Sequence, residues 1–457
     1  MLLRVQRSQS ADSAGQIVQR DSDGVRVHEE ILEGNRTVSG KSQSNQVLVG
    51  AGPVVVLKRG EEDRIIAGHP WVYAGAVQRV SPEAADGCAV RVLDHRRRFL
   101  GVGFYNSRSK INVRVLAHDE VQIDKGFFVN RIHEALGLRE RYMPWASSFR
   151  VVNAEGDFLS GLIVDKYDDV LVIQTSALGM DQRQETIVEA LRSILSPRAV
   201  IARNDIATRK LEGLQETRGV LWGSNPGEIS VTLNKLHFAV DLLSGHKTGL
   251  YLDQQVNYAL VADLVAKRPG ARVLDCFCFT GGFGLHATAA GASHVHFIDQ
   301  SEEAITLARR HAELNGLTDR CSFEAANVFD WFKAHAPQTG RESDSSSAAP
   351  QGQYDVIVLD PPSFTRNRAS VPDALRGYKE IHLRAFRLLA AGGLLATFCC
   401  SHHVDARTFL DVILSAAFDT RRVVRRVATF TQAPDHPIIP SIPETEYLKG
   451  YAVELVR

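Results

Sequence analysis

The sequence has no excess of charge of either sign: 53 lysines and arginines face 53 aspartates and glutamates, so the formal net charge is zero. This balance excludes a histone-like protein that binds nucleic acid through its overall charge, but not a local basic surface. No apolar run approaches the roughly 20 residues that span a bilayer, and the N-terminus lacks the apolar core of a signal peptide. We therefore expect a cytoplasmic protein without a membrane segment.

Cysteine is also scarce, with six residues and no C-x-x-C pair. A disulfide framework is not expected in a chain of this length, and we interpret Cys88 and Cys321 as small buried apolar residues. We expect no metal site at His246, His402 or His403, because no carboxylate lies at ligand spacing from them. A reducing compartment leaves room for a catalytic thiol.

Changes of composition predict the domain boundaries, and 457 residues allow two or three domains. Residues 1–52 are rich in serine, glutamine, glycine and charge without a sustained period, which indicates a disordered extension. Residues 53–120 hold short β-like runs between turn residues, typical of a small barrel or sandwich. Residues 121–245 combine a helix expected over 125–142 with several strands and the hairpin "EISVTLNKLHFAVDL", and we expect an α+β domain there.

The last region, 246–457, alternates strand-like and helix-like segments. Such alternation predicts an α/β fold in which helices cover both faces of a parallel sheet. A low-complexity segment, 336–353, interrupts the pattern and is expected to be a flexible insertion. The expected strands of this sheet are 272–277, 294–299, 321–326, 354–360 and 393–400.

A glycine-rich turn, "VLDCFCFTGGFGLHA", follows the first of these strands. Gly281, Gly282 and Gly284 would let the backbone approach a ligand where a Cβ atom would collide. The spacing is not G-x-G-x-x-G, so a purely structural turn remains the alternative.

The next two strands end in side chains suited to a nucleoside. Asp299 is placed to accept hydrogen bonds from two ribose hydroxyls, as in dinucleotide-binding folds. Asn327 could read the exocyclic amine of an adenine, and it could equally cap the following helix. An adenosine-bearing cofactor without a pyrophosphate would fit this arrangement.

The stretch "VIVLDPPSFTRNR" reads as a buried strand that two prolines stop and stiffen. Asp360 therefore stands at the strand's carboxyl end, beside the expected end of the next strand at "FCCS". Because side chains alternate along a strand, Cys399 and Cys400 should face opposite ways, one toward packing and one toward the cleft. A carboxylate and a thiol on neighbouring strand tips suit chemistry on a flat, polar ring.

Such a pair could methylate carbon 5 of cytosine. Addition of a thiolate at carbon 6 makes carbon 5 nucleophilic toward an electrophilic methyl group. A carboxylate near ring nitrogen 3 could protonate it or hydrogen-bond to it as charge develops. Loss of the carbon 5 proton then expels the thiol. The thiolate must attack carbon 6 of the cytosine from above the ring plane, so an unpaired or flipped cytosine is required.

Seven motifs occur in the order seen in one family: "GHKTGLYLDQ", "FTGGFGLHA", "LDPPSF", "RGYKEIHLRA", "TFCCS", "DHPI" and "YLKGYA". From about Val54 to Arg457 the chain resembles the ribosomal RNA large subunit methyltransferase I family, S-adenosylmethionine-dependent makers of 5-methylcytidine in 23S ribosomal RNA. The resemblance implies a Rossmann-like seven-stranded methyltransferase sheet, an N-terminal PUA β-barrel that binds RNA, with "GHPWVYAGAV" (68–77) as its entry segment, and a central α+β domain.

The resemblance also implies site residues. Cys400 would be the nucleophile and Asp360 the catalytic carboxylate. Contacts to S-adenosylmethionine would come from Lys247, Gln254, Asp275, Phe277, Thr280, Gly281, Gly282, Asp299, Asn327 and Asp360. The chain departs from the family pattern at Cys399, His402, Asn327 and Ser363, where serine, glycine, aspartate and lysine are usual.

RNA contacts are expected from both the first domain and the methyltransferase domain. Seven basic residues lie close together in the first domain: Arg91, Arg96, Arg97, Arg98, Arg108, Lys110 and Arg114. They face few acidic residues, which favours phosphate contact over a merely solvated surface. As substrate-binding residues we single out Arg97, Arg108, Lys110, Pro361, Pro362 and Phe364.

The expected partner is 23S ribosomal RNA or a partly assembled large subunit, and a homodimer is possible on the family resemblance. One alternative is methylation of a base amino group at "DPPSF", which needs no covalent adduct. Another is a noncatalytic RNA-binding assembly factor that keeps the cofactor as a structural element.

Overall fold

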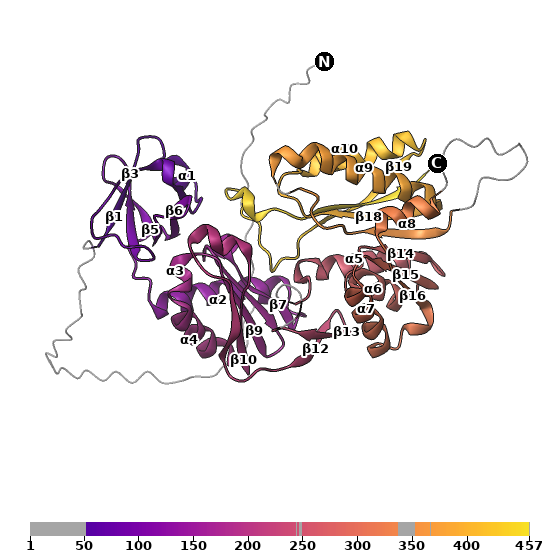
Figure 1. Ribbon diagram of the computed structural model, residues 1–457, viewed down its shortest axis with the longest axis horizontal. Helices are drawn as coiled ribbons and strands as arrows, with labels where there is room; N and C mark the ends of the chain where they lie inside the picture. Colours follow the sequence, from indigo (N-terminus) through magenta and orange to yellow (C-terminus); the bar gives the residue numbers. More distant parts are fainter. Residues whose placement is uncertain (1–51, 244, 246–248, 337–351, 366, 457) are drawn as a thin grey trace, which may run out of the picture. The chain divides into compact units, whose positions relative to one another are not determined.

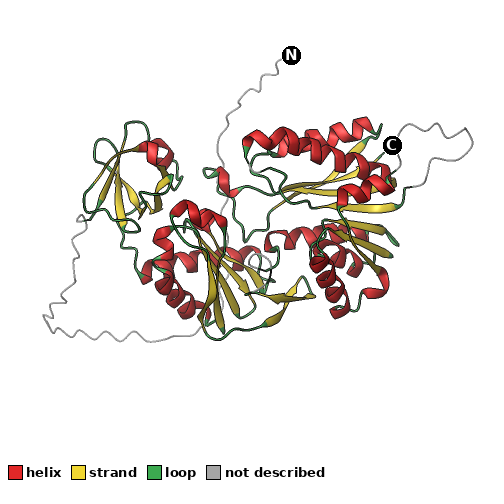
Figure 2. Cartoon of the chain, in the orientation of Figure 1, coloured by secondary structure: helices red, strands yellow, loops and turns green. Residues whose placement is uncertain are grey.

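The computed structural model describes residues 52–243, 245, 249–336, 352–365 and 367–456. The expected N-terminal extension and the expected insertion at 336–353 fall outside these residues except at their edges, and Lys247 falls outside them too. In the described part, strands form sheets of six, five, two and seven strands. Helices lie between the strands of the second and fourth sheets (Figure 2).

The six-stranded sheet has the order β2-β6-β5-β4-β1-β3, and β1 and β4 are parallel. Four of its strands match the β-like runs of the sequence, whereas β2 and β3 were not predicted. Bulges shift the register of several pairs and bend the strands. The elements are β1 (Val54–Leu57), α1 (Asp63–Ile66), β2 (Trp71–Tyr73), β3 (Val77–Val80), β4 (Ala89–Leu93), β5 (Phe99–Tyr105) and β6 (Ile111–Ala117).

The five-stranded sheet has the order β11-β10-β9-β8-β7. The helix predicted at 125–142 is present and precedes this sheet in the chain. The side chain of Asp124 caps this helix by accepting the N–H of Phe127 at 2.9 Å. Its outer strands, β7 and β11, were not predicted. The elements are α2 (Lys125–Tyr142), β7 (Ser148–Asn153), β8 (Leu162–Tyr167), β9 (Val170–Thr175), α3 (Leu178–Asp181), α4 (Gln184–Leu195), β10 (Ala199–Asn204) and β11 (Thr217–Trp222).

The expected hairpin forms from β12 (Glu228–Leu233) and β13 (Leu236–Asp241). Its two turn residues, Asn234 and Lys235, have φ of 47° and 75°. Two successive left-handed residues are typical of the tight turn that matches strand twist.

The seven-stranded sheet has the order β16-β15-β14-β17-β18-β20-β19. The five strands predicted from the sequence are parallel, but β20 is antiparallel to both β18 and β19, so the sheet is mixed. β19 follows α10 (Ala406–Asp419), but among the described residues no α-helix separates β19 from β20, so the antiparallel strand β20 leaves no strand–helix alternation in the sequence. The strands are β14 (Arg272–Cys276), β15 (His294–Asp299), β16 (Cys321–Ala325), β17 (Tyr354–Leu359), β18 (Leu389–Cys399), β19 (Val424–Thr431) and β20 (Lys449–Leu455).

Helices cover both faces of this sheet (Figure 1). Successive residues of a strand enter different cores: Val273 packs in one cluster and Leu274 in the other. The first cluster also contains residues of β8 and of the hairpin, so one core continues from the five-stranded sheet through the hairpin into the seven-stranded sheet. The covering helices are α5 (Gln255–Ala266), α6 (Gly282–Ala289) and α7 (Glu302–Leu314) on the first cluster, and α8 (Val328–His335), α9 (Val371–Leu388) and α10 (Ala406–Asp419) on the second.

The length and apolar character needed to cross a bilayer do not occur together in any helix of the described residues.

Candidate active site

The turn after β14 holds an unusual backbone conformation. Phe277, Phe279 and Gly281 have φ of 60°, 48° and 87°. The left-handed region is uncommon for residues with a bulky side chain, and such residues gather where the surrounding structure imposes a specific shape. The turn is therefore held in a defined form at the carboxyl end of the sheet.

The glycines of this turn serve protein packing more directly than we predicted. A Cβ atom on Gly282 would lie 2.5 Å from the Tyr258 ring. On Gly284 it would overlap the Phe297 ring and lie 2.9 Å from Asp275 Oδ2. Close packing of α6 on α5 and β15 therefore requires glycine at these two positions, and the expected approach to a ligand stays a prediction.

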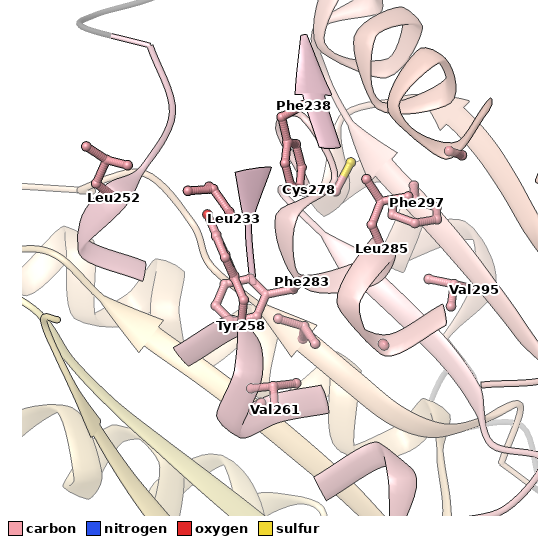
Figure 3. Packing of buried hydrophobic residues seen from close by; sticks show 14 of the residues in the cluster. Leu233, Phe238, Leu252, Tyr258, Val261, Cys278, Phe283, Leu285, Val295 and Phe297 are labelled. Carbon is pink, nitrogen blue, oxygen red and sulfur yellow. The ribbon is translucent and has the colours of Figure 1, made fainter. Parts of the chain in front are cut away.

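The apolar cluster beneath the turn fixes its position. Cys278 points into the same cluster as Phe238, Leu285 and Phe297 (Figure 3). Phe283, next to the glycines, meets Tyr258 edge to face at 4.7 Å between ring centroids. Burial raises the pKa of the Cys278 thiol well above its ordinary value, so this cysteine is a packing residue.

Asp275 is a buried carboxyl group with an unfilled acceptor. Its Oδ2 accepts the Gly284 N–H at 2.8 Å, whereas its Oδ1 is buried and has no hydrogen-bond partner in the described part of the chain. Burial, assisted by the charges of Asp360 and Asp299, raises its pKa to about 8. A buried unsatisfied acceptor within a concentration of negative charge fits a ligand that brings N–H donors and positive charge.

Asp299 ties the tip of β15 to the turn. Its two oxygens accept the N–H groups of Ser301 and Phe279, each at 3.0 Å. A carboxylate offers about four lone-pair sites, so two backbone bonds leave acceptor capacity for hydroxyl groups.

Asn327 caps α8, which confirms one of its two predicted roles. Its Oδ1 accepts the N–H groups of Phe329 at 3.0 Å and Asp330 at 3.3 Å. The oxygen expected to face an adenine amine therefore already accepts two helix N–H groups.

Gln254 lies beside Asp360. Its Nε2 donates to Asp360 Oδ2 at 3.1 Å, and its Oε1 accepts from Asn257 Nδ2 at 2.6 Å. Asn257 also donates to the Thr431 carbonyl at 2.9 Å. Sequence reasoning missed Asn257, although its spacing of three residues from Gln254 at the start of a helix is a usable signal.

The predicted thiol and carboxylate lie on neighbouring strand tips. Strands β17 and β18 pair in parallel, and Cys400 Sγ lies 4.0 Å from the Pro361 carbonyl oxygen. Cys399 is fully buried in the second cluster, whereas Cys400 is half-buried against the first. The prediction that the two thiols face opposite ways is confirmed.

The loop after Cys400 is fixed from two sides. Ser401 is buried, and its hydroxyl is hydrogen-bonded to the Thr365 hydroxyl on the loop that follows Asp360. Lys449, at the start of β20, donates through Nζ to the carbonyls of Ser401 at 2.5 Å and Val404 at 2.7 Å. Sequence reasoning missed these residues, and the lysine of the motif "YLKGYA" was their one signal.

The residues after Asp360 differ in their exposure. Pro361 is buried and Pro362 is exposed. The half-buried Phe364 ring lies 4.6 Å from the Tyr378 ring and 5.7 Å from the Phe329 ring. Part of the ring expected to stack on a base therefore packs within the protein.

Four of the seven basic residues expected to contact phosphate form ion pairs within the protein, and two of the four, Arg91 and Arg114, are partly or largely buried. Arg114 is 12% exposed and pairs with Glu212 at 2.9 Å and Glu155 at 3.4 Å. Arg91 pairs with Glu120. Burial among these partners leaves Arg114 unsuited to RNA contact.

The other basic residues are exposed but do not form one cluster. Arg97 lies in the turn between β4 and β5, whereas Arg108 and Lys110 lie between β5 and β6. These turns are at opposite ends of β5, whose seven residues span roughly 20 Å. The expected close grouping is thus corrected to two basic turns.

Glu62, Asp94 and His95 are the one group in the described residues with three potential metal-ligating atoms within 4.8 Å. Asp94 already accepts the N–H groups of Arg96 and Arg98, each at 2.8 Å. Asp94 is therefore engaged by the turn that follows it, and Glu62 Oε1 lies 3.3 Å from His95 Nδ1.

Comparison with known families agrees with this geometry. Residues 55–118 match the family described as a PUA-like domain, and residues 219–440 match the S-adenosylmethionine-dependent methyltransferase family. These matches confirm the PUA-like first domain, the methyltransferase domain and the cofactor that the resemblance implied.

Curated relatives match over nearly their whole length. The chain is 37% identical over 405 residues to ribosomal RNA large subunit methyltransferase I of Alteromonas mediterranea, covering 88% of this chain and 98% of the relative. It is 39% identical over 404 residues to the protein of the same name from Shewanella denitrificans, covering 87% and 98%.

Solved structures share the fold. A candidate methyltransferase in complex with S-adenosylhomocysteine matches with a TM-score of 0.72 at 19% identity, over 88% of this chain and 99% of that one. A candidate S-adenosylmethionine-dependent methyltransferase from Streptococcus mutans matches with a TM-score of 0.71 at 18% identity, with the same coverage. The Rossmann-like fold predicted for the methyltransferase region is confirmed.

Proposed function

This chain belongs to the ribosomal RNA large subunit methyltransferase I family, and from that premise we propose that it makes 5-methylcytidine in 23S ribosomal RNA. The observation that carries the proposal is the half-buried Cys400 thiol beside the loop of Asp360. A half-buried thiol beside this loop has a use in carbon-5 methylation, where it activates the ring by covalent addition.

The residues around the glycine-rich turn fit S-adenosylmethionine. The unfilled oxygen of Asp275 and the nearby charges of Asp299 and Asp360 suit a ligand that carries an ammonium and a sulfonium group. Bound S-adenosylmethionine supplies an electrophilic methyl group. The residues that would hold it are Gln254, Asp275, Phe277, Thr280, Gly281, Gly282, Asp299, Asn327 and Asp360, with Lys247 from outside the described residues.

Cys400 and Asp360 take the two roles at the cytosine. The Cys400 thiolate adds to carbon 6, and the electron pair of the 5,6 double bond moves to carbon 5, which becomes the nucleophile. Asp360 donates a hydrogen bond or a proton at ring nitrogen 3 as negative charge develops there. After methylation, loss of the carbon 5 proton restores the double bond and expels the thiolate.

Two features support this division of labour. The side chain of Gln254 holds Asp360 Oδ2 by an N–H bond at 3.1 Å, which orients the carboxyl group. The exposed Pro362, in the loop that follows Asp360, offers a rigid apolar surface at the same strand tip.

RNA would also contact the first domain. Arg97, Arg108 and Lys110 are exposed on two turns, where arginine and lysine can contact phosphates, although Arg108 also lies 3.8 Å from Asp86 Oδ2. Their spacing along β5 suits an extended or folded RNA segment better than a single phosphate. We propose 23S ribosomal RNA or a partly assembled large subunit as the cytoplasmic substrate, and a homodimer as the assembly.

Methylation of a base amino group is the second candidate, favoured by the "DPPSF" sequence alone. It would use the Asp360 loop to bind the amine and would leave Cys400 as a packing residue. A noncatalytic assembly factor would bind the same RNA without turnover.

The test is mass spectrometry of nucleosides after the protein, S-adenosylmethionine and 23S RNA with unmodified cytidines are mixed. Wild type and Cys399→Ala should give 5-methylcytidine, and Cys400→Ala should give none. Cys399→Ala is the matched control, because it removes a neighbouring thiol that faces the opposite core.

A methyl group on an exocyclic nitrogen that persists in both variants would contradict the covalent route. Absence of any methylated nucleoside with wild type, on free RNA and on large-subunit particles alike, would favour the assembly factor.

A further inference from the structure

Lys449 is a buried lysine next to the proposed nucleophile. It is 7% exposed and begins β20, where it pairs in register with Cys399 of β18 and Thr431 of β19. This register places its side chain at the end of β18, where the chain continues into Cys400. The sheet itself therefore fixes the root of this side chain at the reactive strand tip.

The ammonium group clamps the loop that follows Cys400. An ammonium has three N–H donors. Two of them reach the carbonyl oxygens of Ser401 at 2.5 Å and Val404 at 2.7 Å. The same loop is held from the other side by the Ser401 hydroxyl, which contacts Thr365 and accepts the His403 N–H at 3.2 Å. The backbone that carries Cys400 thus has little freedom to move.

Two carbonyl dipoles do not neutralise a buried positive charge. No ion pair within 4.0 Å joins Lys449 to a carboxylate in the described part of the chain. Burial lowers the pKa of Lys449, and the thiols of Cys399 and Cys400 offset part of that effect. A buried cation without an anionic partner is costly, so a nearby group that can become an anion is expected.

We propose that Lys449 is a positioning residue for Cys400: its ammonium fixes the loop at 401–404 and favours the thiolate form of Cys400. Its contribution to methyl transfer rests on the proposed function. Its effect on the reactivity of the thiol does not, because alkylation of the free protein reports that reactivity without RNA or cofactor.

Other titratable groups surround this pair and enter any pH dependence. Cys399, His402, His403 and Asp405 come from the end of β18 and its loop, Tyr378 from α9, Asp360 from the loop after β17, and Glu446 from the approach to β20. Because they remain the same in wild type and variant, a shift between the two profiles isolates Lys449.

The experiment measures the rate at which iodoacetamide alkylates Cys400 in the full chain between pH 6 and pH 10, by tandem mass spectrometry of the peptide that contains it. Lys449→Met should move the midpoint of the profile upward by about one pH unit and slow alkylation at pH 7 about tenfold. Lys449→Gln keeps a donor for the loop but loses the charge, so it should show the same upward shift. It replaces Lys449→Met in the experiment if that variant does not fold.

Lys166→Met is the matched control. Lys166 is also partly buried, has a pKa lowered by burial, and donates through Nζ to a single carbonyl, that of Ser147, at 2.9 Å in the five-stranded sheet. Its loss should leave the Cys400 profile unchanged.

An unchanged profile in a folded Lys449→Gln or Lys449→Met protein would overturn the proposal and assign the ammonium to another anion, such as an RNA phosphate. Equal shifts in the Lys166 and Lys449 variants would overturn it as well. Loss of 5-methylcytidine formation with a shifted profile supports both proposals, whereas a shifted profile in a protein that methylates a nitrogen contradicts only the proposed function.

Discussion

Replacement of Asp275 by asparagine should stabilise the protein without cofactor and weaken its binding of cofactor. The substitution keeps the shape of the side chain, and its amide oxygen can still accept the Gly284 N–H that now bonds to Oδ2 at 2.8 Å. What it removes is a carboxyl group that is 1% exposed, with a pKa raised by burial to about 8 from its ordinary 3.8.

The magnitude follows from this shift. At pH 7 the carboxyl group is ionised in the unfolded chain and mostly protonated in the folded one, so folding takes up a proton. The difference between pH 7 and the ordinary value of 3.8 is about three units, or roughly 4 kcal/mol at about 1.4 kcal/mol per unit.

The sign is that of an acid whose folded pKa is raised. Between about pH 4 and pH 8 the unfolded chain binds fewer protons than the folded one, so the contribution of Asp275 to stability falls as pH rises. Asparagine binds no proton in either state. The stability advantage of Asp275→Asn should therefore be near zero at pH 4 and grow by roughly 3 kcal/mol between pH 5 and pH 7.

Asp275→Asn should weaken cofactor binding, although it stabilises the protein without cofactor. A bound cationic group favours the ionised carboxyl group, so binding near neutral pH should release a proton from Asp275. Loss of a hydrogen bond to a charged group should weaken binding roughly 10- to 100-fold in Asp275→Asn and abolish this proton release.

Urea unfolding without cofactor at pH 5, 6 and 7, and calorimetric titration with S-adenosylmethionine in two buffers of different ionisation enthalpy, measure both effects. Asp169→Asn, at a carboxylate whose side chain is 58% exposed, controls for loss of a negative charge. A stability difference that does not change with pH, together with unchanged affinity, would refute the buried protonated carboxyl group.

Two further predictions concern packing and orientation at the site. Gly284→Ala should lower the free energy of unfolding by about 1–3 kcal/mol, because the added Cβ overlaps the Phe297 ring. Gly137→Ala, in α2 where a Cβ meets nothing within 4 Å, should raise it by about 0.5–1 kcal/mol, and equal effects in urea unfolding would contradict this reasoning. Gln254→Leu should slow methyl transfer about tenfold or more, because Asp360 loses the N–H bond that Gln254 donates. Gln255→Leu, which loses only a bond to the Ser148 carbonyl, should keep the rate, and a radiolabelled methyl-transfer assay in which both variants match would exclude this role for Gln254.

Local patterns predicted much of the fold. The helix at 125–142, the hairpin turning at Asn234 and Lys235, and the five parallel strands all formed where period and turn chemistry indicated. These elements are determined by residues close together in sequence, which is why a single sequence suffices for them. The antiparallel pair β19 and β20 left no such local sign.

The site was predictable only in part, for the same reason. The tips of β17 and β18 could be placed side by side from topology, and with them Asp360 and Cys400. Lys449 could not, because its contact with Ser401 joins residues 48 apart through the register of a strand that was not predicted. Nor could the sequence show that Arg97 and Arg108 lie at opposite ends of one strand, since closeness along the chain does not tell which end of a strand a turn occupies.

The core that runs from β8 through the hairpin into the seven-stranded sheet has a consequence for how such proteins arise. A gene segment that encoded the seven-stranded sheet alone would lack Leu233 and Phe238, and it would expose the residues of α6 and α7 in the same cluster. The hairpin without the sheet would have no core of its own. Recombination that carries the hairpin together with the sheet would keep this shared core intact. The methyltransferase match begins at residue 219, ahead of the hairpin, so the inherited unit begins before β12 and not at the first strand of the sheet that binds the cofactor.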